Sequence, residues 1–424
     1  MRVYSLFFAA LLGSFGVPSV AHFDARALQK IEVDAYRPSP VPDRILMSLS
    51  GDPATERAVN WRTDNNAQQA RAQYTLADGG PDQEARAATV DAATEILETG
   101  EYRSFHHSVR FKSLRPSTQY IYRVGDGQVW SEWMQFRTAS TEAEPFGFIY
   151  FGDAQNDLKS RWSRVARQAY TGMPKADFIL HAGDLVNKPE NDQEWGQWFY
   201  AAGWINGSTP SIATPGNHEY KDDKLAKQWR PHFTLPENGP DNALLAESVY
   251  FLDYQGTRFI SLNSQSLSVD SEETALQQRD WLERVLSDNP NHWTVIFHHH
   301  PMMPATKRRT PHEGLNEYFK PLYEKFNVDL VLQGHDHSYA RGENLSSGGT
   351  WLGQQSPVYV VSVSGPKMYD GGASWPKVAG RDLQLYQLIE VDQNRIRYRS
   401  YRADGVLFDQ FVLEKDDKGR RRVE

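Results

Sequence analysis

Four short apolar runs after residue 145 end in the same way, with a glycine followed by a side chain that can bind a metal. These ends read GDAQ (152–155), GDLVN (183–187), GNHE (216–219) and GHDH (334–337). A fifth apolar run ends directly in three histidines, at residues 298–300. Glycine lets the backbone turn sharply at the edge of a sheet, and ligands gather beyond the carboxyl ends of the strands of open α/β sheets. The pattern therefore predicts an α/β domain whose strand ends form one polar site.

Helical spacing of apolar residues separates these runs. It is visible in LKSRWSRVARQAY (158–170), in EETALQQRDWLERVLSD (272–288) and in LNEYFKPLYEKF (315–326). The segment SVYFLDYQGTRFISLNS (248–264) is typical of a hairpin. Strands that alternate with helices predict a sheet covered by helices. We expect this α/β domain to span residues 146–415.

The region before it has a different pattern. Between residues 37 and 140, short alternating runs such as RAVNWRT (57–63) lie between turn-rich pieces, which predicts a small antiparallel β-sandwich. In LRPSTQYIYRV, Leu114 and Tyr120 have the spacing of a fibronectin type III corner, in which the buried tyrosine bonds back to the backbone through its hydroxyl. Trp61 is expected to pack in the core. The polar segment TASTEAEPFG then links the two domains.

Residues 1–21 have the pattern of a secretory signal peptide, with an early arginine, an apolar run and small residues at Ser19 and Ala21. Cleavage is expected after Ala21. No later stretch is apolar enough over a sufficient length to cross a bilayer. We therefore expect a secreted or periplasmic protein without a membrane span.

The composition limits the chemistry of any metal site and the class of partner. The chain has no cysteine, so disulfides and thiolate ligands are excluded. Its formal net charge of −8 argues against a dedicated nucleic-acid partner. The basic tail KGRRRVE is interpreted as a solvated end.

The order of the five strand-end motifs resembles the metallophosphoesterase superfamily, and the sandwich in front of them is similar to that of the purple acid phosphatases. The resemblance covers residues 37–415. It implies a fibronectin type III-like sandwich followed by a four-layer domain of two mixed β-sheets flanked by helices. It also implies two divalent metal ions (Mn, Fe, Zn, Mg or Ca), and a phosphate-ester substrate that a metal-bridging hydroxide attacks.

The resemblance also implies a role for individual residues. In this family the histidine ligand of the fourth motif stands two residues before a proline, which selects His299 from the triplet and leaves His298 and His300 as neighbours. His218 would hydrogen-bond the substrate oxygen or protonate the leaving group. The implied metal ligands are Asp153 and His337 for the first metal, Asn217, His299 and His335 for the second, and Asp184 for both.

Two positions depart from the family pattern. Asn187 stands where purple members have the tyrosine that binds ferric iron, and Gln155 stands where many other members have a histidine. Either amide oxygen could be a weak fourth ligand of the first metal, so the site suits a divalent ion better than a ferric one. We expect a protein without purple colour.

Three candidate substrate-binding residues follow the histidine ligand. They are His300 and the pair Arg308 and Arg309, since arginine forks suit phosphate oxygens. A basic surface loop is an equally good interpretation of the arginine pair. The sequence indicates no oligomeric state.

Three functions remain open. The first is an exported phosphomonoesterase of acid phosphatase type. The second is a phosphodiesterase that acts on nucleotides or lipid headgroups, with the same metal centre but a different pocket wall. The third is a secreted binding protein whose metal centre has decayed, which the two departures favour and the near-complete ligand set disfavours.

Overall fold

The computed structural model describes residues 35–65, 69–100, 102–343, 357–415 and 421–423. The chain divides into a unit of residues 1–37 and a unit of residues 38–424. The second unit contains every strand and helix discussed below. The expected signal peptide, residues 1–21, lies outside the described residues. None of the helices among the described residues is long and apolar enough to cross a lipid bilayer.

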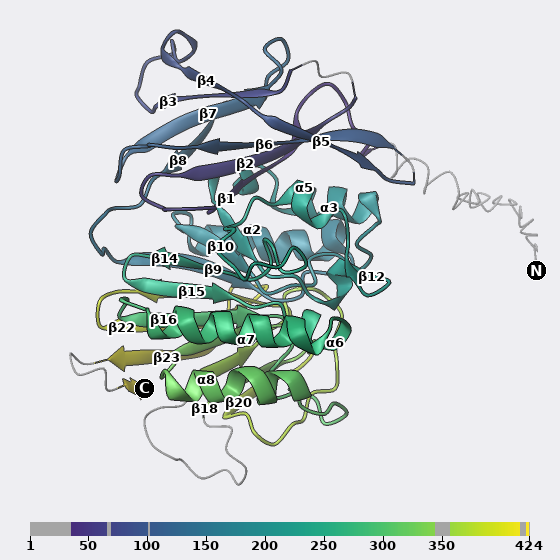
Figure 1. Cartoon of the computed structure of the whole chain (residues 1–424), viewed down its shortest axis with the longest axis vertical. Helices are drawn as coiled ribbons and strands as arrows, with labels where there is room; N and C mark the ends of the chain where they lie inside the picture. The colour runs from purple at the N-terminus through teal and green to yellow at the C-terminus, as the bar shows by residue number, and fades with distance from the viewer. Residues whose placement is uncertain (1–34, 66–68, 101, 344–356, 416–420, 424) are drawn as a thin grey trace, which may run out of the picture. The chain divides into compact units, whose positions relative to one another are not determined.

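The first part of the second unit is a β-sandwich (Figure 1). One layer has the strand order β1-β2-β6-β5, and the other has the order β4-β3-β7-β8. The strands are β1 (Asp43–Ser48), β2 (Arg57–Thr63), β3 (Arg71–Leu76), β4 (Ala88–Asp91), β5 (Ala93–Glu98), β6 (Arg103–Phe111), β7 (Gln119–Gly125) and β8 (Met134–Arg137).

The core of the sandwich contains the side chains to which the sequence assigns a packing role. Trp61 is 1% exposed and packs in one cluster with Val59, Tyr122 and Phe136. The hydroxyl of Tyr120 accepts a hydrogen bond from the backbone N–H of Arg115 at 2.8 Å. Both predictions are confirmed: Trp61 is a core residue, and Tyr120 bonds back to the backbone beside the turn that precedes its strand.

The second part contains two mixed β-sheets. One has the order β24-β23-β22-β21-β9-β10-β11, and the other has the order β14-β15-β16-β17-β19-β18-β20. The strands of the first are β9 (Phe146–Phe151), β10 (Phe178–His181), β11 (Ser211–Ala213), β21 (Leu385–Val391), β22 (Arg395–Arg402), β23 (Leu407–Lys415) and β24 (Arg421–Val423). Those of the second are β14 (Tyr250–Tyr254), β15 (Thr257–Ser261), β16 (Trp293–His298), β17 (Leu330–Gln333), β18 (Tyr339–Glu343), β19 (Val358–Val361) and β20 (Val378–Gly380).

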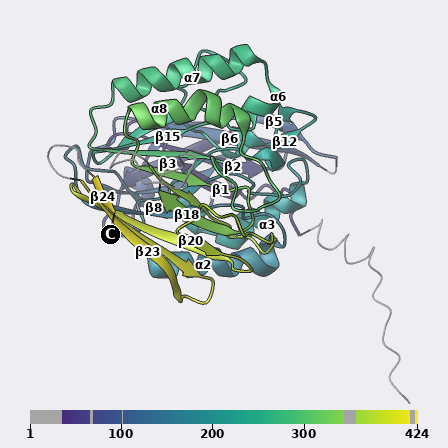
Figure 2. The ribbon, with the colours of Figure 1, turned by 90° about the horizontal axis from the view of Figure 1, so that it is seen from below.

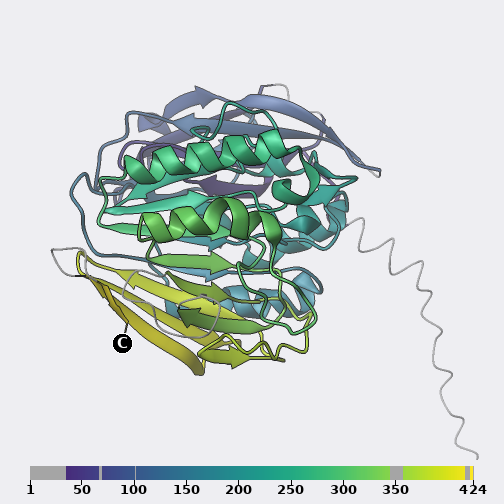
Figure 3. The same cartoon turned by 60° about the horizontal axis from the view of Figure 1, so that its bottom comes forward.

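Helices cover the outer faces of these two sheets (Figures 2 and 3). Phe148 and Phe259 meet between the sheets in a core that extends to Val165 and Trp198 on the helices of the first sheet. A second core joins the other sheet to its own helices. The helices are η2 (Leu158–Trp162), α2 (Ser163–Gly172), α3 (Asp192–Ala202) and α4 (Ile205–Ser208) beside the first sheet, and α7 (Glu272–Ser287), η4 (Leu315–Phe319) and α8 (Lys320–Lys325) beside the second. The expected four-layer architecture is confirmed.

The sandwich and the α/β part share one sheet. Strand β1 pairs in parallel with β11, with Ser48 opposite Ser211. Beside this junction Asp192, the first residue of α3, accepts hydrogen bonds from Arg44 at 2.7 and 2.8 Å and from Arg62 at 3.1 Å. The two parts are therefore joined by main-chain pairing and by a buried ion-pair network.

Candidate metal centre

The five motifs meet where parallel strands of the two sheets end. GDAQ, GDLVN and GNHE follow β9, β10 and β11 of the first sheet, and GHDH follows β17 of the second. Strand β16 ends at His298, so His299 is the first residue beyond it. This is the edge at which side chains from separate strands can converge.

The turns beyond these strands place unusual demands on the backbone. Asp153, Asp184 and His335 have φ angles of 41°, 52° and 70°, in the left-handed region that few residues other than glycine adopt. A Cβ at Gly216 would lie 2.2 Å from Oδ1 of Asp184, and one at Gly334 would lie 2.4 Å from Oδ2 of Asp153. Strained polar residues beside obligatory glycines are typical of functional sites.

One group of candidate ligands comprises Asp153, Asp184 and His337, which can each offer one atom within 4.8 Å of the others. Nε2 of His337 lies 3.7 Å from Oδ1 of Asp153. Nδ1 of His337 donates to the carbonyl of Lys367 at 2.9 Å. That bond fixes the tautomer in which Nε2 has a free lone pair for a metal.

A second group comprises Asp184, His299 and His335. Nε2 of His299 lies 3.2 Å from Oδ2 of Asp184 and 3.1 Å from Oδ1 of Asn217. The same amide oxygen is 2.9 Å from Nδ1 of His335. Nδ1 of His299 donates to the carbonyl of Ala182 at 2.9 Å, which leaves Nε2 available. Asp184 thus belongs to both groups.

The chemistry of this donor set fits two divalent cations. Oδ1 of Asp153 is buried without a hydrogen-bond partner. Burial raises the pKa of Asp153 well above its usual range, whereas the neighbouring His299 holds the pKa of Asp184 below its usual range in spite of burial. Burial lowers the pKa of His299, but the charge and hydrogen bond of Asp184, the charge of Asp153 and the bond to Ala182 together outweigh it and raise that pKa to about 9. Cations at this place would keep both carboxylates ionised and the imidazoles neutral.

Gln155 and Asn187 are placed differently. The amide of Gln155 is buried in the first group, with Nε2 donating to Oδ2 of Asp184 at 2.8 Å and lying 3.1 Å from Nε2 of His337. Asn187 contributes its backbone carbonyl, which accepts from Nδ1 of His218 at 2.6 Å. Within the described part of the chain, no hydrogen bond joins the Asn187 side chain to either group. The structure brings Gln155 to the centre and makes Asn187 a support for His218.

His218 lies at the rim of the two groups. Its backbone N–H donates to Oδ1 of Asp184 at 2.8 Å, and its Nε2 is 4.0 Å from Oδ2 of the same residue. The side chain is 26% exposed. An imidazole held in this way can reach both the centre and the solvent.

Glu219 is a residue whose role the sequence did not suggest. Its buried carboxylate accepts backbone N–H bonds from Asp184 at 2.8 Å, Leu185 at 2.8 Å and Gly216 at 2.7 Å. It therefore holds the second and third motif loops together. Burial, followed by the charge of Asp184, raises the pKa of Glu219 to about 7. Its position inside GNHE was the signal that could have identified it.

A pocket of about 820 Å³ opens beside the second group and contains His335 together with His300, Arg308 and Arg309. The ring centroid of His300 lies 4.2 Å from that of His335. Arg308 pairs with Asp370 at 2.7 Å on the surface, and Arg309 lies 3.4 Å from Asp336. The pocket also contains His312, a residue that the sequence reading did not select, with its ring 5.3 Å from that of His300.

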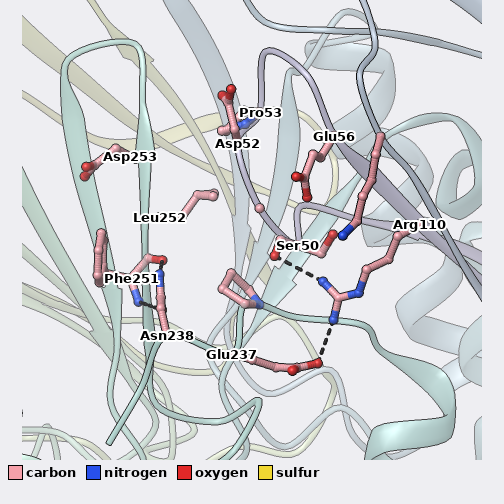
Figure 4. Close-up of a pocket in the computed structure, with 13 residues that line it drawn as sticks. Ser50, Asp52, Pro53, Glu56, Arg110, Glu237, Asn238, Phe251, Leu252 and Asp253 are labelled. Carbon is pink, nitrogen blue, oxygen red and sulfur yellow. Dashed lines mark hydrogen bonds and ion pairs between the residues drawn. The ribbon is translucent and has the colours of Figure 1, made fainter.

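Another pocket, of about 670 Å³, lies where the sandwich meets the α/β part (Figure 4). Arg110 of β6 donates there to the carbonyl of Ser50 at 3.3 Å and to Glu237 at 2.7 Å. Its lining contains none of the residues of the two metal-binding groups. Because the charge of Arg110 is already paired, this pocket is not the candidate site.

Two family models match the chain. Residues 42–138 match the purple acid phosphatase N-terminal domain, and residues 148–339 match the calcineurin-like phosphoesterases. Acid phosphatase type 7 of Danio rerio is 26% identical over 376 residues, covering 78% of this chain and 83% of that protein. Acid phosphatase type 7 of Homo sapiens is 27% identical over 336 residues, covering 72% and 71%.

A solved structure has the same fold. It is a purple acid phosphatase from seeds of yellow lupin (Lupinus luteus), with a TM-score of 0.73 and 16% sequence identity, covering 90% of this chain and 75% of that one. Together with the two metal-binding groups, these findings define a metal-dependent phosphoesterase. The chain combines a purple acid phosphatase N-terminal domain with a calcineurin-like phosphoesterase domain, in the order that purple acid phosphatases have, and it is similar to acid phosphatases over most of its length.

Proposed function

We propose that the protein is an exported phosphomonoesterase with two divalent metal ions. The observation that carries this proposal is the position of Asp184, whose carboxylate belongs to both ligand groups. When bound there, a pair of divalent ions activates water and neutralises the charge that develops on the phosphoryl oxygens. The metals would be held by Asp153, Asp184 and His337 at the first position, and by Asp184, Asn217, His299 and His335 at the second. Gln155 would be a weak fourth ligand at the first position once its amide turns so that Oε1, which is buried without a hydrogen-bond partner, replaces Nε2 there.

The other residues act through position and charge. Nδ1 of His218 donates to the carbonyl of Asn187 while Nε2 faces the centre. In its protonated, imidazolium form His218 therefore donates from Nε2 a hydrogen bond to the substrate or a proton to the leaving alkoxide. His300 lines the adjoining pocket, and Nδ1 of its ring lies 2.9 Å from the hydroxyl of Ser264. Arg308 and Arg309 contact substrate only if they leave Asp370 and Asp336.

The domain assignment is part of the same proposal. Residues 1–21 would direct export, residues 37–140 would form a fibronectin type III-like rigid neighbour, and residues 146–415 would carry all the catalytic groups. The match of the N-terminal family model to residues 42–138 supports this division. Release of a shortened chain into the periplasm or medium, with a new N-terminus after Ala21, would be the expected result of expression in an exporting host.

A phosphodiesterase is the second candidate. The observation in its favour is the size of the pocket beside the second ligand group, about 820 Å³, which could hold a second ester substituent. The match to the calcineurin-like phosphoesterases and the intact ligand groups disfavour the third hypothesis, a binding protein with a decayed centre.

The deciding experiment reconstitutes the protein with Mn²⁺, Fe²⁺, Zn²⁺, Mg²⁺ or Ca²⁺ in turn. Each form is assayed with matched phosphomonoesters and phosphodiesters, and its metal content is measured. The proposal expects about two metal ions per chain and a higher kcat/KM for monoesters. A higher value for diesters would establish the second candidate, and metal-loaded protein without turnover would contradict both.

A further inference from the structure

Helices η2 and α2 carry an outer face that is unusually basic for this protein. Their sequences, LKSRW and SRVARQAYTG, contain four basic residues and no acidic one, although the whole chain has a formal net charge of −8. Lys159, Arg161, Arg164 and Arg167 are all exposed. Asp157 pairs with Arg161, whereas within the described residues Arg164 and Arg167 have no ion-pair partner. Among the described residues, neither guanidinium is therefore paired with an acidic side chain; Arg167 instead donates to the backbone carbonyl of Ala201 at 3.1 Å.

Two large aromatic side chains lie among these cations. Tyr200 lies in the last turn of α3 and Trp204 lies just beyond its end, and they are 50% and 58% exposed. Nζ of Lys159 lies 4.9 Å from the ring centroid of Tyr200, and Cζ of Arg167 lies 5.6 Å from it. The ring of Trp204 packs edge-on against Tyr170 of α2 at 5.2 Å. The cations and the aromatic rings therefore form one continuous surface.

The tip of the hairpin between β22 and β23 extends this surface with aliphatic side chains. Val406 and Leu407 are 51% and 43% exposed. The tip lies beside α2, because a Cβ at Gly405 would be 3.2 Å from Nε2 of Gln168. Figure 2 shows α2 next to the yellow strands of this hairpin. We call the surface formed by Lys159, Arg164, Arg167, Tyr200, Trp204 and Val406 the basic-aromatic face.

We propose that the basic-aromatic face docks the protein on the surface of an anionic lipid bilayer. Tryptophan and tyrosine are the side chains that gather at the membrane–water interface, where the ring is buried and the polar edge stays wet. Lysine and arginine beside them are attracted by anionic headgroups. An exposed valine at a hairpin tip can enter the acyl boundary at little cost.

The aliphatic side chains at the hairpin tip disfavour a single-stranded nucleic acid as the ligand of the basic-aromatic face. Such a strand needs a basic groove with aromatic platforms for successive bases. Here the cations lie on the outer side of a helix, and Val406 and Leu407 offer no platform for a base. The association expected is peripheral and reversible, because it combines a few cations with a small inserted apolar area.

The test measures sedimentation of the full chain with lipid vesicles, without substrate, so its result does not depend on the proposed phosphomonoesterase activity. Vesicles of phosphatidylcholine alone are compared with vesicles that also contain phosphatidylglycerol. We expect binding to the anionic vesicles that weakens as salt is raised. Residues 1–21 contain an apolar run and an early arginine and could contribute to binding. They are identical in all the variants compared below, so the differences between variants isolate the charged face.

Two variants and two matched controls make the test specific to this face. The double variant Arg164→Glu with Arg167→Glu should weaken anionic binding by at least about 25-fold, since each basic residue contributes roughly fivefold. Arg103→Glu with Arg381→Glu changes the net charge equally at exposed positions elsewhere and should retain most of the binding. Trp204→Ala should weaken binding further than Leu244→Ala, which removes another exposed apolar side chain.

Circular dichroism confirms that each variant is folded. The proposal is overturned if the full chain shows no preference for anionic vesicles, or if both double variants lose binding equally. Preferential binding of a single-stranded oligonucleotide at this face, lost in Arg164→Glu with Arg167→Glu while vesicle binding is unchanged, would also overturn it.

Discussion

Single substitutions of the adjacent residues His298 and His299 distinguish the metal ligand from its neighbour in the HHH segment. His298 and His299 are both fully buried, and His→Ala removes the same volume from each position. Nε2 of His299 lies among Asp184, Asn217 and His335, at 3.2, 3.1 and 3.1 Å. His298 instead directs Nδ1 to the carbonyl of His300 at 2.7 Å and stacks on Tyr323. The two variants should therefore fail in different ways.

The sizes of the two effects follow from these positions. Loss of a residue that merely supports a metal ligand weakens metal binding by about 10–100-fold. Removal of the ligand His299 itself should therefore weaken the binding of the second metal by more than about 100-fold, which corresponds to about 2.8 kcal/mol. The second metal and the activity should both disappear. His298→Ala leaves the ligands in place but opens a cavity beside Tyr323, which should lower the free energy of unfolding by about 2–5 kcal/mol.

The measurements are elemental analysis after gel filtration, and urea unfolding with and without a chelator. His298→Ala should keep close to the metal content of the unmodified protein and should still gain stability from metal. In His299→Ala the chelator should have a much smaller effect, because less metal is bound. Equal loss of metal in the two variants would show that the wrong histidine has been assigned as the ligand.

Three further predictions concern the fold, the pH response and the metal. Asp192→Ala should lower the free energy of unfolding by about 3–5 kcal/mol, because it leaves the buried Arg44 and Arg62 without their shared partner; a loss below about 1 kcal/mol in urea unfolding would contradict this. Burial lowers the pKa of His107 to about 4. Between pH 7 and pH 5 this residue therefore binds a proton in the unfolded chain but not in the folded chain. Its contribution alone should lower the free energy of unfolding by about 2 kcal/mol over that pH range. His107→Gln should flatten the pH dependence by that amount, and an unchanged slope would refute the assignment. Protein loaded aerobically with iron should show no phenolate-to-iron band in its visible spectrum, whereas Asn187→Tyr could create one; a strong band in the unmodified protein would show that another tyrosine reaches the iron.

Local patterns were sufficient to predict the helical segments at residues 158–170, 272–288 and 315–326 and the strands that precede the five motifs, but not helix α3. In α7 (Glu272–Ser287) the apolar side chains recur at helical spacing, and the hydroxyl of Ser271 caps the first turn by accepting from the N–H of Thr274. Strands β10 and β16 are buried along their whole length, so their apolar runs are recognisable without knowledge of their neighbours. Such signals lie within a few residues of one another and need no tertiary contact.

The candidate ligands were also accessible from the sequence, since each follows a strand and the order of the motifs is specific. Spacing alone could not show what the other side chains contact. Glu219 binds the backbone of Asp184, 35 residues earlier in the chain. Arg309 lies near Asp336, and Asn187 meets His218 through its carbonyl rather than its amide.

Local sequence therefore specifies the periodic elements and the chemical types of the donors. The folded chain sets how segments far apart in sequence meet: β1 pairs with β11, Asp192 forms ion pairs with Arg44 and Arg62, and the hairpin tip at Val406 lies beside α2. The physical reason is that propensity and periodicity act over one or two turns of chain. Contacts between distant segments form only when burial of the shared core outweighs the entropy lost in closing the chain between them.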